Sequence, residues 1–159
     1  MAYFITFSTY GTYLPGDSRG STDRHEGRLM SRPALVTSTE KLMTETAFRL
    51  DDAGDRLAVR LAVVEVCRER GWRLLALHVL LEHVHGLVQA ESATPGRVMG
   101  DWKAYASRAL KLRRPGRQKF WTRGGAASSV RGSVDEVMRY ILEGQGEPME
   151  TYDAGVRAS

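Results

Sequence analysis

Two apolar runs separated by a short turn constrain this chain more than any other feature. Residues 72–80 and 83–90 are mostly apolar and have the length of strands, and only Leu81-Glu82 lies between them. Two such runs joined by so few residues predict neighbouring antiparallel strands. We therefore expect the rest of the chain to be arranged around a central hairpin.

The segments on both sides of this hairpin alternate between strand and helix patterns. β-branched and aromatic residues predict a first strand over 3–10. The helices are expected over 37–50, 57–71, 95–112 and from 133 onward. Two of them begin with capping-box spacing, in Thr37-x-x-Glu40 and Ser133-x-x-Glu136.

Finer details follow from the same patterns. The helix that ends at Gly71 is expected to bury one stripe, which comprises Leu57, Leu61, Val64 and Cys67. Gly124-Gly125 predicts a short hairpin within 119–131. A polar connection of about 15–37 and a loose tail of about 146–159 complete the chain. Cys67 is the single cysteine, so an internal disulfide is excluded, and we interpret it as a core residue.

The resulting order, β-α-β-β-α-β with an extra strand and a final helix, predicts the fold class. It is typical of an α+β, ferredoxin-like split βαβ fold, in which helices pack on one face of an antiparallel sheet. A C-terminal helix bearing Tyr140 is added. With 159 residues, 42% of them hydrophobic, residues 1–159 are expected to form one domain.

Positive charge is concentrated in one segment. The net charge is +4, but residues 97–131 contain ten Lys or Arg and one Asp, so the remainder carries a net charge of −5. A basic segment on an otherwise acidic chain is typical of phosphate binding, although a solvated helix face has the same composition. Aromatic residues are mixed with the basic ones, which favours unpaired DNA because bases stack on aromatic rings. The candidate DNA-binding residues are Arg97, Lys103, Tyr105, Arg108, Lys111, Arg113, Arg114, Arg117, Lys119, Arg123 and Arg131.

Several other functions are disfavoured by the sequence. No glycine-rich phosphate loop follows a strand, so we expect no nucleotide cofactor. No apolar run is long enough to span a bilayer, and the N-terminus lacks the pattern of a signal peptide. We therefore expect a cytoplasmic, nucleoid-associated protein with no membrane partner.

His83-Val84-His85 is the strongest candidate site. In a strand, residues two apart point to the same face with Cα atoms roughly 6.6 Å apart, so both imidazoles can bind one cation while Val84 faces the core. Two packed histidines without a metal are the alternative. His78, on the preceding strand, is interpreted as a hydrogen-bonded structural histidine or as a partner of a metal ligand.

Tyr140 is the second feature of interest. Val134, Val137, Met138, Ile141 and Leu142 form the apolar stripe of the last helix, and Tyr140 falls about 130° from the centre of that stripe. A tyrosine placed for core packing would fall on the stripe, whereas an ordinary surface tyrosine could also lie off it.

These motifs together resemble those of a known family. His78-Val79-Leu80-Leu81-Glu82-His83-Val84-His85 is similar to the signature of HUH single-strand transposases, as are Phe120-Trp121-Thr122-Arg123-Gly124 and Arg139-Tyr140-Ile141-Leu142. Residues 9–17 resemble the N-terminal signature of the REP-associated tyrosine transposases.

The resemblance implies an enzyme that nicks and rejoins single-stranded or hairpin DNA. Tyr140 would attack a phosphate and leave a 5′-phosphotyrosine, with Mg²⁺ or Mn²⁺ held by His83 and His85. It also implies a homodimer, with Tyr140 acting in its own subunit or in the partner's.

Two departures from the family pattern matter. Leu81-Glu82 stands where relatives commonly have Pro-Asn, and Gly144 stands where the third metal ligand is usually Asn or Gln. Gly144 could end the helix and let Gln145 bind instead, which we favour, and Glu143 is the alternate ligand. If neither binds, the chain is expected to be a domesticated protein that binds single-stranded or hairpin DNA without cutting it. A small metalloenzyme with another substrate is disfavoured by the basic segment.

Overall fold

The computed structural model describes residues 1–12, 21–23, 27–29 and 45–155 of the chain. The elements are β1 (Ala2–Ser8), β2 (Ser21–Asp23), β3 (Gly27–Leu29), α2 (Ala53–Arg70), β4 (Arg73–Val79), β5 (His83–Gln89), α3 (Pro95–Arg113), β6 (Ala126–Ser129), α4 (Val134–Glu143) and β7 (Glu150–Asp153). Most of the expected polar connection lies outside the described residues, as do the Thr37 capping box and Tyr13.

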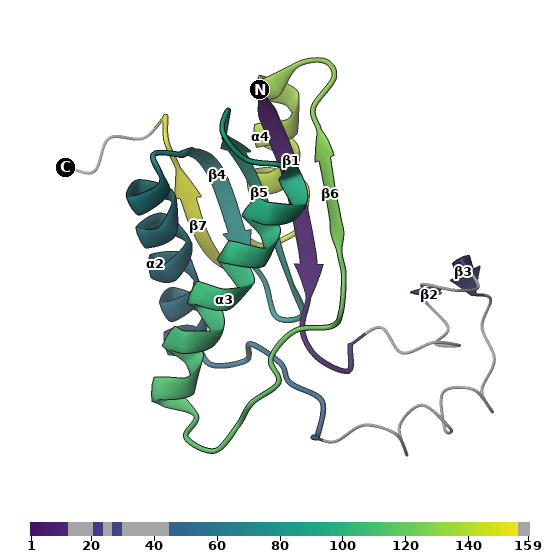
Figure 1. Ribbon diagram of the computed structural model, residues 1–159, viewed down its shortest axis with the longest axis vertical. Coiled ribbons are helices and arrows are strands. Elements are labelled where there is room, and N and C mark those ends of the chain that lie inside the picture. The colour runs from purple at the N-terminus through teal and green to yellow at the C-terminus, as the bar shows by residue number, and fades with distance from the viewer. Residues whose placement is uncertain (13–20, 24–26, 30–44, 156–159) are drawn as a thin grey trace.

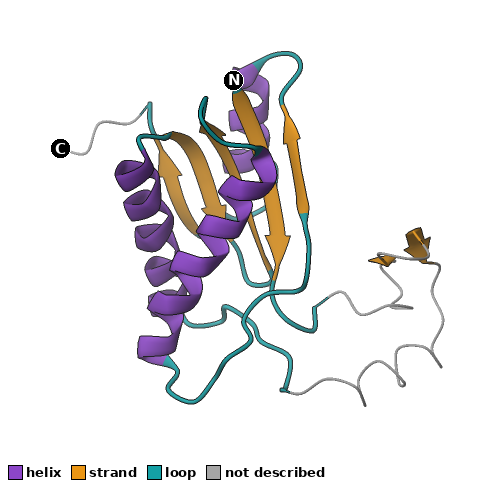
Figure 2. Ribbon diagram, in the orientation of Figure 1, coloured by secondary structure: helices purple, strands orange, loops and turns teal. Residues whose placement is uncertain are grey.

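The predicted hairpin is present: β4 and β5 pair with each other inside a five-stranded antiparallel sheet (Figure 2). The strand order is β6-β1-β5-β4-β7. Without β7 this is the order of the split βαβ fold, in which β1 and β5 are the central pair. The predicted fold class is confirmed. β2 and β3 pair with each other in a separate two-stranded sheet.

Helices cover both faces of this sheet (Figure 1). α2 and α3 pack on one face over the larger core, which includes Ile5, Val63 and Trp102. α4 packs on the other face, where Ile141 contacts a smaller core. Gly86 is required for the first packing, because a Cβ there would lie 2.5 Å from the Trp102 ring.

The buried stripe of α2 differs from the predicted one. Leu57 and Leu61 are 38% and 53% exposed, whereas Val59, Ala62, Val63 and Val66 face the sheet. Asp55 is also fully buried, since Arg113 and Arg114 from the end of α3 bind its carboxylate at 2.7 and 2.5 Å. The prediction was correct for Cys67, which is buried, and burial raises the pKa of its thiol to about 12.

Two connecting segments were also predicted wrongly. Residues 45–50 are extended rather than helical, because Phe48 and Leu50 donate backbone hydrogen bonds to Tyr10 and Leu81. Residues 119–131 do not form their own hairpin, since β6 pairs with β1. In both cases a neighbouring strand or turn supplies the hydrogen bonds that a local structure would have supplied.

The segment after Gly146 is not a loose tail as far as residue 153. Residues 150–153 form β7, which pairs with Ala76, Leu77, His78 and Val79 of β4. The open edge of β4 supplies the backbone partners that turn this polar segment into a strand.

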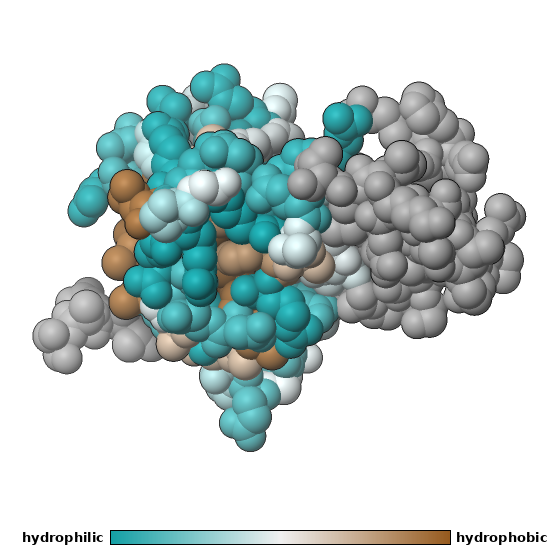
Figure 3. Space-filling view, turned by 90° about the horizontal axis from the view of Figure 1, so that it is seen from below, coloured by the Kyte–Doolittle hydropathy of each residue, from teal (hydrophilic) through white to brown (hydrophobic). Residues whose placement is uncertain are grey.

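Hydrophilic side chains dominate the end of the molecule seen in Figure 3, with a small apolar group among them. Within the described ranges, no helix is long and apolar enough to cross a membrane.

Candidate functional site

β5 presents His83 and His85 on the face of the sheet that α4 covers. Val84, between them, is fully buried in the core on the α2 and α3 side. The centroids of the two imidazole rings are 4.6 Å apart, and their planes are inclined by 82°. The strand alternation predicted from the sequence is confirmed, and the two rings lie side by side.

Each imidazole keeps one buried nitrogen that has no hydrogen bond to the described residues. These atoms are Nδ1 of His83 and Nε2 of His85. The other nitrogen of His85, Nδ1, lies 3.1 Å from the hydroxyl of Thr6 on β1. The Thr6 hydroxyl can accept a hydrogen bond from Nδ1–H, and in that tautomer Nε2 keeps its lone pair.

Burial keeps both histidines neutral near neutral pH. Desolvation, together with the neighbouring His83 and His78, lowers the pKa of His85 to about 4. Desolvation also lowers the pKa of His83, although the charge of Glu82 opposes that shift. Two neutral imidazoles with unused lone pairs fit a divalent metal, which binds neutral histidine.

α4 places Tyr140 beside this pair. The hydroxyl of Ser133 accepts a hydrogen bond from the Glu136 amide at 3.2 Å, which confirms the predicted start of the helix. Ile141 is fully buried and anchors α4 on the sheet, whereas Tyr140 is 52% exposed. The Tyr140 ring lies 6.4 Å from the His85 ring, between centroids. The phenol is therefore off the apolar stripe, near the histidines and open to a substrate.

Gln145 is the candidate third ligand that lies on the histidine side. α4 ends at Glu143, and a Cβ at position 144 would lie 2.7 Å from the Tyr140 carbonyl oxygen, so the close turn there requires glycine. Gln145 and His83 line one cavity of about 370 Å³, here called the histidine cavity.

Glu143 lies elsewhere. It lines a separate hollow with Tyr140 and Arg139. Among the described residues, no third His, Cys, Asp or Glu joins the two histidines in a group that could hold a metal. The structure therefore brings His83, His85 and Tyr140 together, with Gln145 in the histidine cavity, whereas Glu143 lies beside Tyr140 and apart from that cavity.

His78 is a buried residue that forms hydrogen bonds on both sides of the turn near the histidines. Its Nε2 accepts a hydrogen bond from the Met149 amide, and its Nδ1 lies 3.0 Å from the Ile141 carbonyl oxygen, to which it donates. Both partners flank the turn that carries Gln145. The interpretation of His78 as a hydrogen-bonded structural histidine is confirmed, and burial lowers its pKa.

Arg49 was missed by the sequence prediction. It lines the histidine cavity and forms ion pairs with Glu82 and with Asp51, the latter at 3.2 Å. A carboxylate next to His83 indicates that some cation should lie nearby, but the sequence contains 23 Lys and Arg and does not say which.

Many of the predicted DNA-binding cations already have partners within the protein. Arg113 and Arg114 bind Asp55, and Lys103 donates to the carbonyl oxygens of Thr122 and Gly124. Other candidates also have partners: Arg97 pairs with Asp101, Arg117 with Thr46 and Glu45, Lys119 lies over the Tyr10 ring, and Arg108 over Tyr105.

Three of the candidate cations have no recorded ion pair, side-chain hydrogen bond or ring contact with the part of the chain that the structure describes. They are Lys111, Arg123 and Arg131. The aromatic residues are similarly divided, because Trp102 and Phe120 are buried in the core and Tyr105 remains accessible, with its hydroxyl on Glu69 at 2.5 Å. DNA binding by the basic segment stays a prediction. Its candidate contacts are now Lys111, Arg123, Arg131 and Tyr105.

Comparisons with known proteins agree with the motifs. The model of a family described as IS200-like transposases matches residues 45–144. The structure of a REP-associated tyrosine transposase bound to a REP hairpin is similar, with 18% identity and a TM-score of 0.49; the match covers 89% of this chain and 64% of that one. A protein from Deinococcus radiodurans R1, assigned as a transposase, is 12% identical with a TM-score of 0.49, over 91% and 90% of the two chains. No curated protein matches.

The matched segment contains His83, His85 and Tyr140, and it spans more than half of the 159 residues. The chain therefore belongs to the IS200-like transposase family.

Proposed function

We propose that this protein nicks and rejoins single-stranded or hairpin DNA through a covalent bond to Tyr140. The observation that carries the proposal is the accessible phenol beside two buried imidazoles, each with an unused nitrogen. A solvent-accessible nucleophile next to an incomplete ligand set is what a metal-assisted transfer reaction needs.

His83 and His85 would hold a divalent cation, Mg²⁺ or Mn²⁺, with Gln145 as the third protein ligand. When bound, the cation polarises the phosphate that is attacked. Thr6 orients His85 through Nδ1, and His78 holds the turn that carries Gln145. Orientation of this kind typically changes metal affinity or activity by about 10- to 100-fold.

In each direction the proposed reaction forms one bond between phosphorus and oxygen and breaks another. The phenol oxygen of Tyr140 attacks phosphorus and forms an O–P bond, its proton leaves to solvent, and the bond from phosphorus to the 3′ oxygen breaks. The 3′ oxygen takes up a proton, which leaves a free 3′-hydroxyl and a 5′-phosphotyrosine. A 3′-hydroxyl can then attack the phosphotyrosine and restore the DNA, so rejoining needs no nucleotide cofactor.

The same chain supplies the tyrosine and the histidines in this arrangement. The 6.4 Å between the ring centroids of Tyr140 and His85 supports action within one subunit. Lys111, Arg123 and Arg131 would contact phosphates, and Tyr105 could stack on an unpaired base. A homodimer stays a prediction.

The proposal is tested with a labelled hairpin oligonucleotide, incubated with the protein and Mn²⁺ and analysed under denaturing conditions. A protein–DNA band that requires metal supports cleavage. Tight binding without any such band would instead favour the alternative, a DNA-binding protein that does not cut. Gly144 favours this alternative, because it has no side chain at the position where the family's third metal ligand is usually found.

Metal binding should depend on pH in an unusual way. Burial lowers the pKa of His85 to about 4, so its neutral form already dominates at pH 5.5, where an ordinary histidine with a pKa of 6.5 is mostly protonated. Burial lowers the pKa of His83 as well, so we expect the Mn²⁺ affinity, measured by calorimetry, to fall less between pH 7.5 and 5.5 than it would for two histidines of ordinary pKa, and to fall most steeply towards pH 4. A tenfold loss per unit below pH 6.5 would contradict this.

His78→Phe should loosen the turn that carries Gln145 while the sheet remains folded. The substitution removes the hydrogen bonds to Met149 and Ile141 and keeps an aromatic ring of similar size. We expect amide exchange in 144–149 to become at least about tenfold faster and cleavage to slow by about 10- to 100-fold.

Val63→Ala is the matched control for His78→Phe. Val63 is fully buried on α2, on the opposite face of the sheet, so its truncation lowers stability without touching the turn. Equal exchange rates in 144–149 for His78→Phe and Val63→Ala would refute the positioning role.

A further inference from the structure

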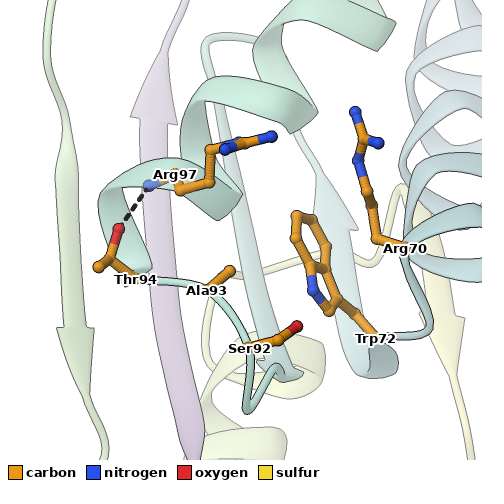
Figure 4. A pocket seen from close by; sticks show the side chains of 6 residues that line it. All are labelled: Arg70, Trp72, Ser92, Ala93, Thr94 and Arg97. Atoms are coloured by element: carbon orange, nitrogen blue, oxygen red, sulfur yellow. Dashed lines mark hydrogen bonds between the residues drawn. The ribbon is translucent and has the colours of Figure 1, made fainter.

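A second cavity lies at the end of the sheet opposite the histidines. It has a volume of about 330 Å³ and is here called the arginine cavity; its lining residues are Arg70, Trp72, Ser92, Ala93, Thr94 and Arg97. Figure 4 shows Arg70, from α2, and Arg97, from α3, with the indole of Trp72 between them. The volume is within the range of cavities that bind small ligands.

Two guanidinium groups in this cavity share one carboxylate. Arg70 and Arg97 both direct Nε to Asp101, at 3.2 and 3.3 Å. Their terminal nitrogens have no recorded hydrogen bond to the described residues, so a net charge of +1 and several donors remain. Planar guanidinium groups with free terminal N–H groups match the oxygens of a phosphate.

The surroundings of the two arginines favour the same kind of ligand. α3 begins at this cavity and has no acidic residue in its first turn, so the positive end of its dipole is not neutralised. The Ser92 hydroxyl is exposed, and no hydrogen bond to the described residues is recorded for it. Both features attract an anion.

The walls of the cavity are fixed before any ligand arrives. The Trp72 amide donates to the Cys67 carbonyl oxygen at 2.8 Å, and the Tyr3 hydroxyl donates to the Ala93 carbonyl oxygen at 2.9 Å. Trp72 is only 8% exposed, so its indole edge forms a rigid apolar wall. A preformed cavity loses less conformational entropy on binding than a mobile surface does.

The location relates this cavity to the proposed cleavage site. β5 begins at His83 and ends at Gln89, which pairs with Arg73, the residue after Trp72. Six residues of strand span about 20 Å. The cavity lies on the face of the sheet that α2 and α3 cover, and the two imidazoles lie on the face that α4 covers, so DNA that reaches both sites must span more than this distance.

We propose that the arginine cavity binds a backbone phosphate of the DNA substrate, at the other end of β5 and on the opposite face of the sheet from the site of cleavage. Arg70 and Arg97 hold the same phosphate, and the indole edge of Trp72 contacts the sugar or base of that nucleotide. This inference rests on the proposed function, because it assumes that the ligand is DNA. It adds Arg70, Trp72 and Ser92, all outside the basic segment, to the binding surface.

The test measures affinity for a hairpin oligonucleotide in EDTA, as a function of salt concentration, so that cleavage plays no part. Arg70→Ala and Arg97→Ala should each weaken binding by roughly 5- to 20-fold. Each should also reduce the slope of log K against log salt by about 0.7–0.9, the value for one phosphate. Arg73→Ala is the matched control, because Arg73 is exposed, adjacent and outside the cavity.

Two further variants separate a shared phosphate from general charge. The Arg70→Ala/Arg97→Ala double variant should bind little worse than either single variant, because both arginines hold one group. Asp101→Asn removes the neutralising carboxylate and should strengthen binding by severalfold, most at low salt. A folding defect cannot produce this gain.

The outcomes are distinct. Failure of the unaltered protein to bind any DNA overturns both this inference and the proposed function. Binding that Arg70→Ala leaves unchanged, or that Arg73→Ala weakens equally, overturns the inference alone. Additive losses in the double variant, or the same loss with a strand too short to span about 20 Å, also overturn it.

Discussion

Tyr140→Phe should abolish the covalent protein–DNA adduct and leave DNA binding unchanged. The substitution removes the only atom that would attack phosphorus and keeps the ring, which lies near Phe4 and His85 at 6.2 and 6.4 Å between centroids. Loss of a nucleophile lowers turnover by several orders of magnitude, so we expect a decrease of at least about 1,000-fold. Gel analysis of the adduct and an affinity measurement on the same preparation check both parts.

Tyr105→Phe is the matched control for this variant. Tyr105 is also accessible and lies on a helix, but its hydroxyl contacts Glu69 on the opposite face of the sheet from α4. This variant should keep the adduct. Mass spectrometry should locate the nucleotide on the peptide that contains Tyr140, and a nucleotide on any other tyrosine would show that the proposed mechanism is wrong.

His85→Ala should remove metal-dependent cleavage while most DNA affinity remains. His85 is 8% exposed and supplies one of the two unused imidazole nitrogens, so its loss leaves His83 as a single histidine ligand. We expect Mn²⁺ affinity to fall by at least about 100-fold, and cleavage with it. His83→Ala should behave alike.

We expect DNA affinity to be retained because the candidate phosphate contacts belong to other elements than the histidines. The candidate phosphate contacts Lys111, Arg123 and Arg131 belong to α3 and the segments around β6, not to β5. Calorimetry with Mn²⁺ and a filter-binding measurement in EDTA separate the two properties. Normal cleavage by either histidine variant, with unchanged metal dependence, would mean that the histidine pair is structural.

The sequence predicted the core of the fold because hydrophobic periodicity is a local signal. The hairpin of 72–90 and the capped α4 could both be identified from a few consecutive residues. β7 could not, because Glu150–Asp153 has no apolar alternation and becomes a strand only on the free edge of β4. The predicted buried stripe of α2 was wrong because this helix has apolar residues on two sides. Packing on the sheet buries the side that contains Val59 and Val63.

The arrangement of the candidate site residues could be predicted in part, because it also depends on local geometry. The spacing of His83 and His85 and the position of Tyr140 follow from strand and helix geometry. The partners of the arginines do not, since Arg113 and Asp55 are 58 residues apart and no local pattern connects them. Arg70 and Trp72 likewise meet Arg97 only through the packing of α2 beside α3.

The strand that follows the tyrosine helix has a consequence for subunit exchange. α4 is joined to β6 by a short connection and to β7 by another, and both strands pair with the sheet of the same molecule. Transfer of α4 to a partner would require β7 to leave β4, or to move with α4, and would break the two His78 bonds. Mixing of subunits would then be governed by the rate of local unfolding, so that differently altered copies complement each other slowly or not at all.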